Sequence, residues 1–153
     1  MKTTAKNMTE MQERRSASLD LIKKLTAERA EVLALYCRVA GLEPYERQKT
    51  DKPISSLIQE FCQLLMDYIA VGHFSLYERI VNGKERRRAP AELAEKLYPS
   101  IAETTDIALA FNDKYDTEEH SRDISGLEQD MSRLGQALAA RAELEDKLLQ
   151  ALL

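Results

Sequence analysis

The stretch FCQLLMDYIAVGHFSLYERIV, residues 61–81, decides the fold because it reads as one long amphipathic helix. At about 100° per residue, a single broad arc collects most of its apolar side chains. The arc consists of Phe61, Cys62, Leu65, Met66, Ile69, Gly72, Leu76, Tyr77 and Ile80. An arc of this width predicts a helix that packs against two or three others.

Two residues in the middle of this helix are unusual for a segment built only for packing. Gly72 lies within the apolar arc, and glycine costs about 1 kcal/mol relative to alanine in a helix interior. We therefore expect another helix to approach closely at Gly72. His73 is expected in the core beside Tyr77, hydrogen-bonded to a neighbour. A metal site would need three or four ligands, and His120 is remote in the sequence.

The opposite flank of the same helix carries a different set of side chains. It consists of Glu60, Gln63, Asp67, Ala70, Val71, Phe74 and Glu78. An aromatic ring among carboxylates on a solvent face is typical of a docking site, where the ring anchors a partner and the acids select a basic one. The alternative is that a neighbouring loop simply buries Phe74.

The rest of the chain predicts further long helices and no convincing strand, since there are five Gly, four Pro and no alternating apolar runs. Helical spacing runs from Leu19 to a stop at Gly41 and Pro44. The helix of the opening stretch is expected to start near Pro53, with Asp51 as N-cap. Its expected end is Asn82-Gly83.

A third helix is expected over about 91–115, with Pro90 in its first turn and a kink or break at Pro99, near Tyr98. Asp116 and Glu119 have capping-box spacing and predict the start of a fourth helix. Its apolar stripe is clear from Leu127 onward.

These elements predict an all-α protein, an antiparallel four-helix bundle with additional short helices. The chain of 153 residues suits one domain. Residues 19–153 are expected to form a single helical-bundle domain. Residues 1–18 are expected to be a polar N-terminal segment, either frayed or a short helix docked through Met8 and Met11.

Arg141 and Glu145 interrupt the apolar stripe of the last helix. They are four residues apart and can pair along the helix. In the core they would need further partners, because buried charges are costly unless paired. The alternative is an exposed pair at the edge of the stripe.

Composition and motifs exclude several kinds of function. The net charge of −4 disfavours direct contact with nucleic acid, and the KERRR run at 84–88 is expected to be a solvated loop. No phosphate loop or nucleophile motif occurs, so neither an enzyme nor a cofactor is expected. Cys37 and Cys62 are expected to be buried free thiols. Without an apolar leader or a membrane-length run, we expect a cytoplasmic protein that does not contact the membrane.

Two blocks of the chain resemble the Rsd/AlgQ family, the regulators of sigma D. The motifs FCQ, DY, GHFS and YER lie within residues 57–81, and LEDKL lies within residues 134–149. On the first long helix, Lys23, Lys24 and Leu25 stand where the family often has an Asp-Arg-Trp-like run.

The resemblance implies an all-helical anti-sigma factor that binds region 4 of the housekeeping sigma factor of RNA polymerase. It implies sequestration of that factor from promoter DNA and core polymerase, and leaves open a direct contact with core polymerase. The expected partner-binding residues are Arg29, Asp67, Tyr68, Ala70, Val71, Phe74 and Glu78.

Two other functions remain open. One is a helical adaptor that regulates a signalling or phosphocarrier protein, with sigma binding secondary. Recovery of sigma factor in a pull-down would distinguish the first reading from this one. The other is a helical enzyme or metal protein built around Cys62, His73 and Tyr77. Elemental analysis would test its metal version.

Overall fold

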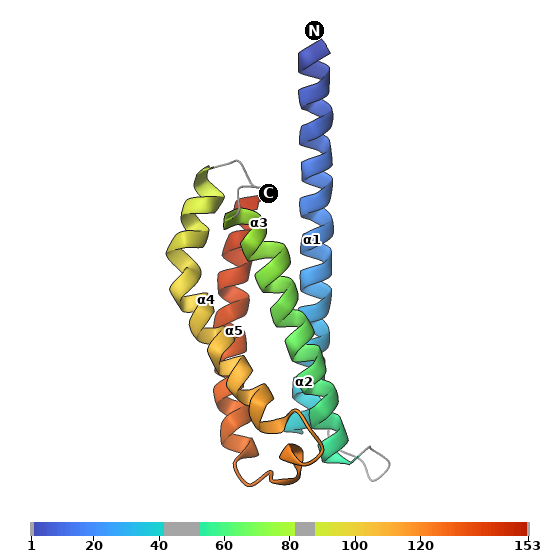
Figure 1. The fold of residues 1–153 in the computed structure, drawn as a ribbon, viewed down its shortest axis with the longest axis vertical. Helices are drawn as coiled ribbons and strands as arrows, with labels where there is room; N and C mark the ends of the chain where they lie inside the picture. The colour runs from blue at the N-terminus through green and yellow to red at the C-terminus, as the bar shows by residue number, and fades with distance from the viewer. Residues whose placement is uncertain (1, 42–52, 82–87, 153) are drawn as a thin grey trace.

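A computed structural model describes residues 2–41, 53–81 and 88–152 of the chain (Figure 1). These residues contain no strand, which confirms the all-α class. The elements in order are α1 (Lys2–Ala40), α2 (Ile54–Ala70), the π-helix η1 (Val71–Tyr77), α3 (Glu78–Val81), α4 (Arg88–Tyr115), the 3₁₀ helix η2 (His120–Arg122) and α5 (Leu127–Leu152).

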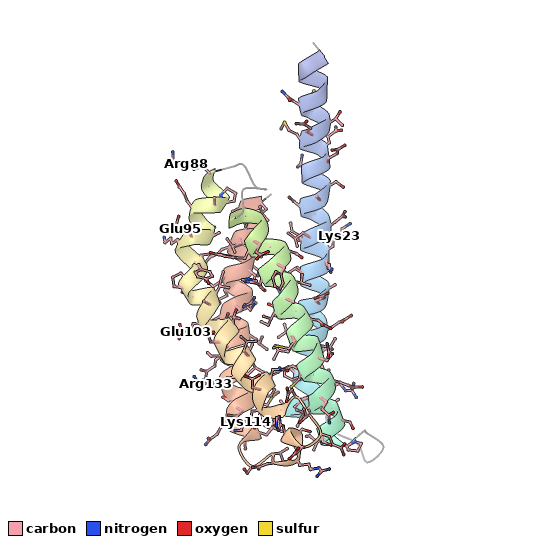
Figure 2. The ribbon with its side chains drawn as sticks, in the orientation of Figure 1. Lys23, Arg88, Glu95, Glu103, Lys114 and Arg133 are labelled. Carbon is pink, nitrogen blue, oxygen red and sulfur yellow. The ribbon has the colours of Figure 1, made fainter. Side chains whose placement is uncertain are left out.

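The long helices lie side by side, and each runs in the opposite direction to the one before it (Figure 1). α2 packs against α1 and α4, and α5 packs against α4 and α1. Phe61 on α2 sits at the centre of one layer of the core, edge-on to Tyr36 of α1 and Phe111 of α4. Charged side chains such as Lys23, Glu95 and Glu103 cover the outside (Figure 2).

α1 is longer than the sequence predicts. Residues 2–18 are not a separate segment but the first turns of one 39-residue helix, and these turns project beyond the other helices (Figure 1). Met8 and Met11 are 59% and 67% exposed, so the expectation that they dock this segment is wrong. The helix ends as predicted at Gly41, which has a φ of 69° and donates its N–H to the Arg38 carbonyl.

The segment from α2 to α3 is helical throughout, as the opening stretch predicts, and begins at Ile54 directly after Pro53. The predicted cap Asp51, the stops at Pro44 and Asn82-Gly83, and residues 84–87 of the basic run lie outside the described residues. Arg88, the last residue of that run, is exposed at the start of α4.

α4 and α5 differ from expectation at two places. Of the two alternatives expected at Pro99, a kink or a break, the break is wrong, because α4 continues through the proline, which is exposed. No helix starts at Asp116, because side chains there form a local turn instead. The His120 N–H donates to Thr117 Oγ1 at 3.0 Å, and the His120 ring pairs with Asp116 at 2.8 Å. α5 begins only at Leu127.

Candidate partner-binding face and the polar network behind it

The Gly-His pair in the opening stretch lies in η1, where the helix widens. The Glu78 N–H donates to the His73 carbonyl, five residues back, instead of the usual four. Such π-helical turns occur frequently at functional sites. This turn is not predicted by the sequence pattern, because an α-helical periodicity places every residue at about 100° from the one before it.

Phe74 on η1 is an exposed aromatic residue on the outer flank of the helix. It is 62% exposed, so the alternative in which a loop buries it is wrong. The His73 ring stands edge-on to the Phe74 ring with centroids 4.9 Å apart. Asp67 and Ala70 are also exposed on this flank, and Glu78 is half-buried. We call the following five residues the outer face of η1: Asp67, Ala70, His73, Phe74 and Glu78.

Carboxylates gather along the seam between α1 and α2, next to the outer face. Glu31 and Glu60 line an open groove of about 550 Å³ at this seam, whose floor is apolar. Burial raises the pKa of the Glu28 carboxyl, and the nearby charges of Asp67 and Glu31 add to this despite Lys24. Among the described residues Glu28 Oε2 is buried without a hydrogen-bond partner. Carboxylates from both helices therefore line this seam, together with the cation Arg38.

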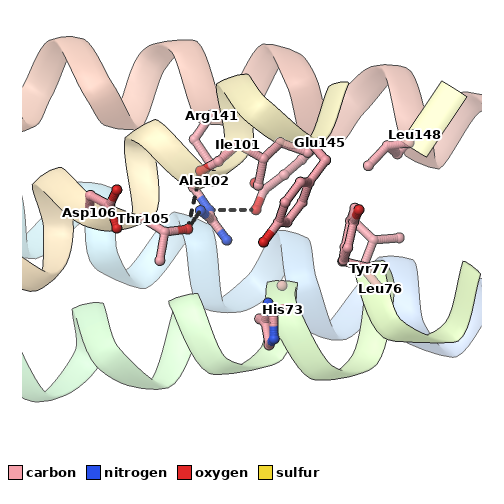
Figure 3. Close-up of a pocket in the computed structure, with 12 residues that line it drawn as sticks. His73, Leu76, Tyr77, Ile101, Ala102, Thr105, Asp106, Arg141, Glu145 and Leu148 are labelled. Atoms are coloured by element: carbon pink, nitrogen blue, oxygen red, sulfur yellow. Dashed lines mark hydrogen bonds and ion pairs between the residues drawn. The ribbon is translucent and has the colours of Figure 1, made fainter. Parts of the chain in front are cut away.

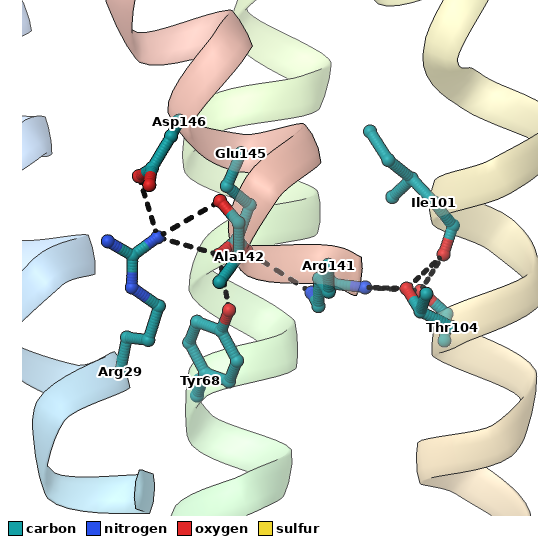
Figure 4. A network of polar contacts seen from close by, with 9 residues as sticks. Arg29, Tyr68, Ile101, Thr104, Arg141, Ala142, Glu145 and Asp146 are labelled. Carbon is teal, nitrogen blue, oxygen red and sulfur yellow. Dashed lines mark hydrogen bonds and ion pairs between the residues drawn. The ribbon is translucent and has the colours of Figure 1, made fainter. Parts of the chain in front are cut away.

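The inner side of η1 packs against a buried ion pair on α5. Figure 4 shows this pair and its hydrogen-bond partners. Arg141 and Glu145 are 1% and 2% exposed, with Nε and Oε2 separated by 3.2 Å. The core alternative for this pair is thus confirmed. Arg141 Nη1 also donates to the hydroxyls of Thr104 and Thr105 on α4, at 3.2 and 2.8 Å.

Glu145 is the centre of this network. Its Oε1 accepts a short hydrogen bond from the Tyr68 hydroxyl and lies 3.5 Å from Arg29 Nη1. Arg29 also pairs with Asp146 at 2.9 Å. Burial raises the pKa of the Glu145 carboxyl, although Arg141, Tyr68 and Arg29 each oppose the shift. One carboxylate thus connects α1, α2 and α5 through charge-assisted hydrogen bonds.

Gly72 lies where this network meets η1. A Cβ at this position would lie 2.9 Å from Arg141 Nη2 and 3.2 Å from Glu145 Oε2. The expected close approach is therefore present, and side chains of α5 make it. Any larger residue at position 72 would have to displace the ion pair.

The described residues contain no group of three or more His, Cys, Asp or Glu side chains that could hold a metal ion. In the same part of the chain, no helix combines the length and the apolar character that crossing a membrane requires.

Comparison with known proteins identifies relatives over nearly the whole chain. Residues 4–153 match the family described as "Regulator of RNA polymerase sigma(70) subunit, Rsd/AlgQ". A protein named "Regulator of sigma D" from Yersinia enterocolitica is 36% identical over 141 residues, which is 90% of this chain and 83% of that protein. Its namesake from Enterobacter sp. (strain 638) is 33% identical over 140 residues, 90% of this chain and 82% of that protein. No solved structure matches the chain significantly.

The chain belongs to the Rsd/AlgQ family. This confirms the resemblance, and the family's description is that of a regulator, which is not an enzyme class.

Three residues of this Rsd/AlgQ protein do not lie where the sequence predicted them. His73 is exposed rather than in the core, with only a 3.9 Å approach to Glu78, because the widened turn rotates it away from the α-helical position. Tyr68 is 1% exposed, so it is not available on the surface. Arg29 points toward α5 and not toward the outer face (Figure 4).

The network was only partly visible in the sequence. Arg141 and Glu145 were found because charges interrupt an apolar stripe, whereas the roles of Tyr68 and Thr105 had no comparable signal. Val71, expected on the partner-binding flank, is half-buried against the core. Tyr77 is also half-buried and stacks on Tyr98 of α4 at 4.9 Å.

Proposed function

We propose that this protein is an anti-sigma factor. It binds region 4 of the housekeeping sigma factor through the outer face of η1 and sequesters it from promoter DNA and core polymerase. In this proposal the helices form an antiparallel four-helix bundle that holds the face in place. The observation that carries the proposal is the 62% exposure of Phe74 among carboxylates.

The chemistry of the face suits a basic partner. Phe74 offers apolar area that a partner can bury, and buried aromatic anchors commonly dominate binding energy. Asp67 and Glu60 are exposed on the same side, and Glu28 and Glu31 add negative charge across the α1–α2 seam. Region 4, as the family resemblance implies, is a basic helix-turn-helix domain. Carboxylates would pair with cations that otherwise contact DNA phosphates.

The buried network supports this role by holding η1 in place. Glu145 connects α5 to α1 and to Tyr68, three residues before η1 begins. A partner that binds a face already held in one conformation pays less ordering entropy on association. The mechanism needs no bond to be made or broken.

The proposal is tested by titrating the purified protein with region 4 of its own organism's housekeeping sigma factor. Phe74→Ala should weaken binding by about 2 kcal/mol or more, roughly thirtyfold in Kd. The free energy of unfolding should change little, because the ring is already exposed. Leu109→Ala is the matched control, since Leu109 is a 42% exposed apolar residue on α4, and its Kd should equal that of wild type.

Two results would contradict the proposal. If wild-type protein does not bind the sigma factor, the function is wrong, and capture of a signalling or phosphocarrier protein would favour the adaptor alternative. If binding occurs but Phe74→Ala and Leu109→Ala have the same Kd as wild type, the sigma-binding surface lies away from η1.

A further inference from the structure

Four aromatic rings form a continuous row that starts at the outer face and crosses from η1 to α4. The Phe74 ring stands edge-on to the His73 ring at 4.9 Å, and the His73 ring lies nearly parallel to the Tyr77 ring at 6.3 Å. The Tyr77 ring in turn stacks on Tyr98 of α4 at 4.9 Å. Aromatic pairs interact when their centroids are about 4.5–7 Å apart, so the rings form one connected surface. We call these residues the aromatic row: Phe74, His73, Tyr77 and Tyr98.

Both ends of the aromatic row are exposed. Phe74 is 62% exposed at one end, and Tyr98 is 45% exposed at the other. Contacts within the described residues explain why the rings of Tyr77 and Tyr98 lie together, but not why two large aromatic side chains remain in water. Contiguous exposed apolar area of this kind is typical of an interaction surface.

A pocket of about 140 Å³ lies beside the aromatic row, and its lining includes His73, Tyr77, Tyr98 and Asp106 (Figure 3). The guanidinium in the same lining, Arg141, is 1% exposed and is paired with Glu145. Asp106 is exposed and has no ion-pair partner among the described residues. The charge that is left without a protein partner beside the rings is therefore negative.

Two further carboxylates border the aromatic row. Glu95 is exposed and lies three residues before Tyr98, so the two side chains are neighbours on α4. Burial raises the pKa of the Tyr77 hydroxyl, and the nearby Tyr98 and Glu95 add to this shift, which places Glu95 close to the stacked rings. Glu78 lies 3.9 Å from the His73 ring on the other side. Lys96 is on α4 as well, but residues two apart on a helix do not face each other, so Lys96 does not share the face of Tyr98.

Rings bordered by carboxylates suit a cation, and an arginine better than a lysine. A guanidinium is planar, so it can lie flat on an aromatic ring and still donate hydrogen bonds from its edge to a carboxylate. The ammonium of lysine is a compact and strongly hydrated charge that lacks this flat shape.

We propose that the partner-binding surface continues along the aromatic row onto α4, where an arginine side chain of sigma region 4 stacks on Tyr98 beside Glu95. This inference rests on the proposed function, because the arginine belongs to the same partner. It adds a second contact, on a different helix from the outer face, and makes Tyr98 a residue that selects for arginine.

The test compares two replacements of Tyr98 in titrations of the full chain with region 4. Tyr98→Leu keeps an apolar side chain but removes the ring, and it should raise the Kd roughly fivefold. Tyr98→Phe keeps the ring and removes only the hydroxyl, so its Kd should be that of wild type. Urea denaturation of both variants shows that the protein titrated is folded.

Glu95→Gln tests the carboxylate beside the ring. It should raise the Kd about threefold at low salt and less at high salt, because ions screen exposed charges. Glu143→Gln is the matched control, since Glu143 is exposed on α5 and lies two residues from Arg141, which faces the pocket. Its Kd should be that of wild type at both salt concentrations.

Nuclear magnetic resonance identifies the partner side chain. In region 4 labelled with ¹⁵N-arginine, the Nε–H proton of one arginine should move upfield in the complex, because it lies over the face of an aromatic ring. The shift should persist with Tyr98→Phe and Phe74→Ala and disappear with Tyr98→Leu. A merely structural role of Tyr98 would not produce this pattern.

The possible failures are distinguishable. If Phe74→Ala weakens binding but folded Tyr98→Leu binds as wild type does, this inference is wrong and the proposed function stands. Equal losses for Tyr98→Phe and Tyr98→Leu would show that the hydroxyl acts and not the ring, and the absence of an upfield arginine signal would show that the group on Tyr98 is not arginine. Either result overturns the inference. If wild-type protein does not bind region 4 at all, the proposed function and this inference are both wrong.

Discussion

The two sides of the seven-residue helix η1 differ in burial and in what their side chains contact. On the inner side, Gly72 and Leu76 are buried, and Gly72 lies against the Arg141–Glu145 pair. On the outer side, His73 and Phe74 are exposed. Residues adjacent in the sequence are therefore under different constraints. The size of the inner side chains is limited by the side chains of α5 that they contact. Packing within the described residues does not account for the exposed ring of Phe74 on the outer side.

This difference separates stability from recognition within one helical turn. Inner substitutions should change the free energy of unfolding and leave the chemistry of the outer face intact. Outer substitutions should change partner affinity and leave unfolding unchanged.

The largest effect is expected for Glu145→Ala. It would leave Arg141 buried without its carboxylate partner, and breaking a buried pair typically costs about 3–5 kcal/mol. The free energy of unfolding from urea denaturation measures the loss. Asp146→Ala is the control, because Asp146 is 56% exposed, and exposed pairs contribute about 0–1 kcal/mol.

A loss no larger for Glu145→Ala than for Asp146→Ala would contradict the view that the inner side depends on this network. Replacing both members of the pair, with Arg141→Met and Glu145→Leu, should recover much of the stability, because an apolar pair of similar size leaves no charge buried.

A smaller loss of stability is expected for Gly72→Leu, since overpacking costs about 1–3 kcal/mol. Gly72→Ala should cost less than Gly72→Leu, because one methyl group displaces only the ends of the Arg141 and Glu145 side chains. The melting temperature reports both changes. In Gly126→Ala the added Cβ would lie 3.3 Å from the flexible Lys114 ammonium and at an ordinary contact distance of 3.7 Å from Asp130 Oδ2, so this control should melt near wild type. A wild-type melting temperature for Gly72→Leu would show that position 72 tolerates bulk.

Much of the fold was predictable from the sequence because it depends on local patterns. Apolar spacing predicted the long helices, and Gly41 predicted the end of α1. The prediction that the last helix starts at Asp116 was wrong, because Asp116 and Glu119 have the spacing of a capping box but Asp116 and Thr117 bond to His120 in a local turn. The N-terminal half of α1 was missed because a polar helix that projects from the other helices has no apolar stripe to detect.

The site was less predictable because its key features depend on three-dimensional contacts. Spacing placed Phe74 and Asp67 on one flank, and both are exposed. His73 was misplaced because a π-turn changes the angular position of the residues within it. Tyr68 and Arg29 were assigned to the partner, yet both contact Glu145, a residue 77 and 116 positions away in the chain. No periodicity within one helix reports such a contact.

The smallest effect is expected for Asp67→Asn, which keeps the size of the outer-face side chain and removes its charge. An exposed charge pair contributes at most about 1 kcal/mol, so affinity for sigma region 4 should fall about fivefold. The loss should shrink as salt rises, because ions screen exposed charges, whereas the loss for Phe74→Ala should not. Titration at low and high salt separates the two contributions.

Asp113→Asn on α4 carries the same charge change at another exposed position and should leave Kd unchanged at both salt concentrations. Equal losses for Asp67→Asn and Asp113→Asn would mean that the protein attracts its partner through net charge alone, and that the outer face provides an apolar anchor without a paired carboxylate.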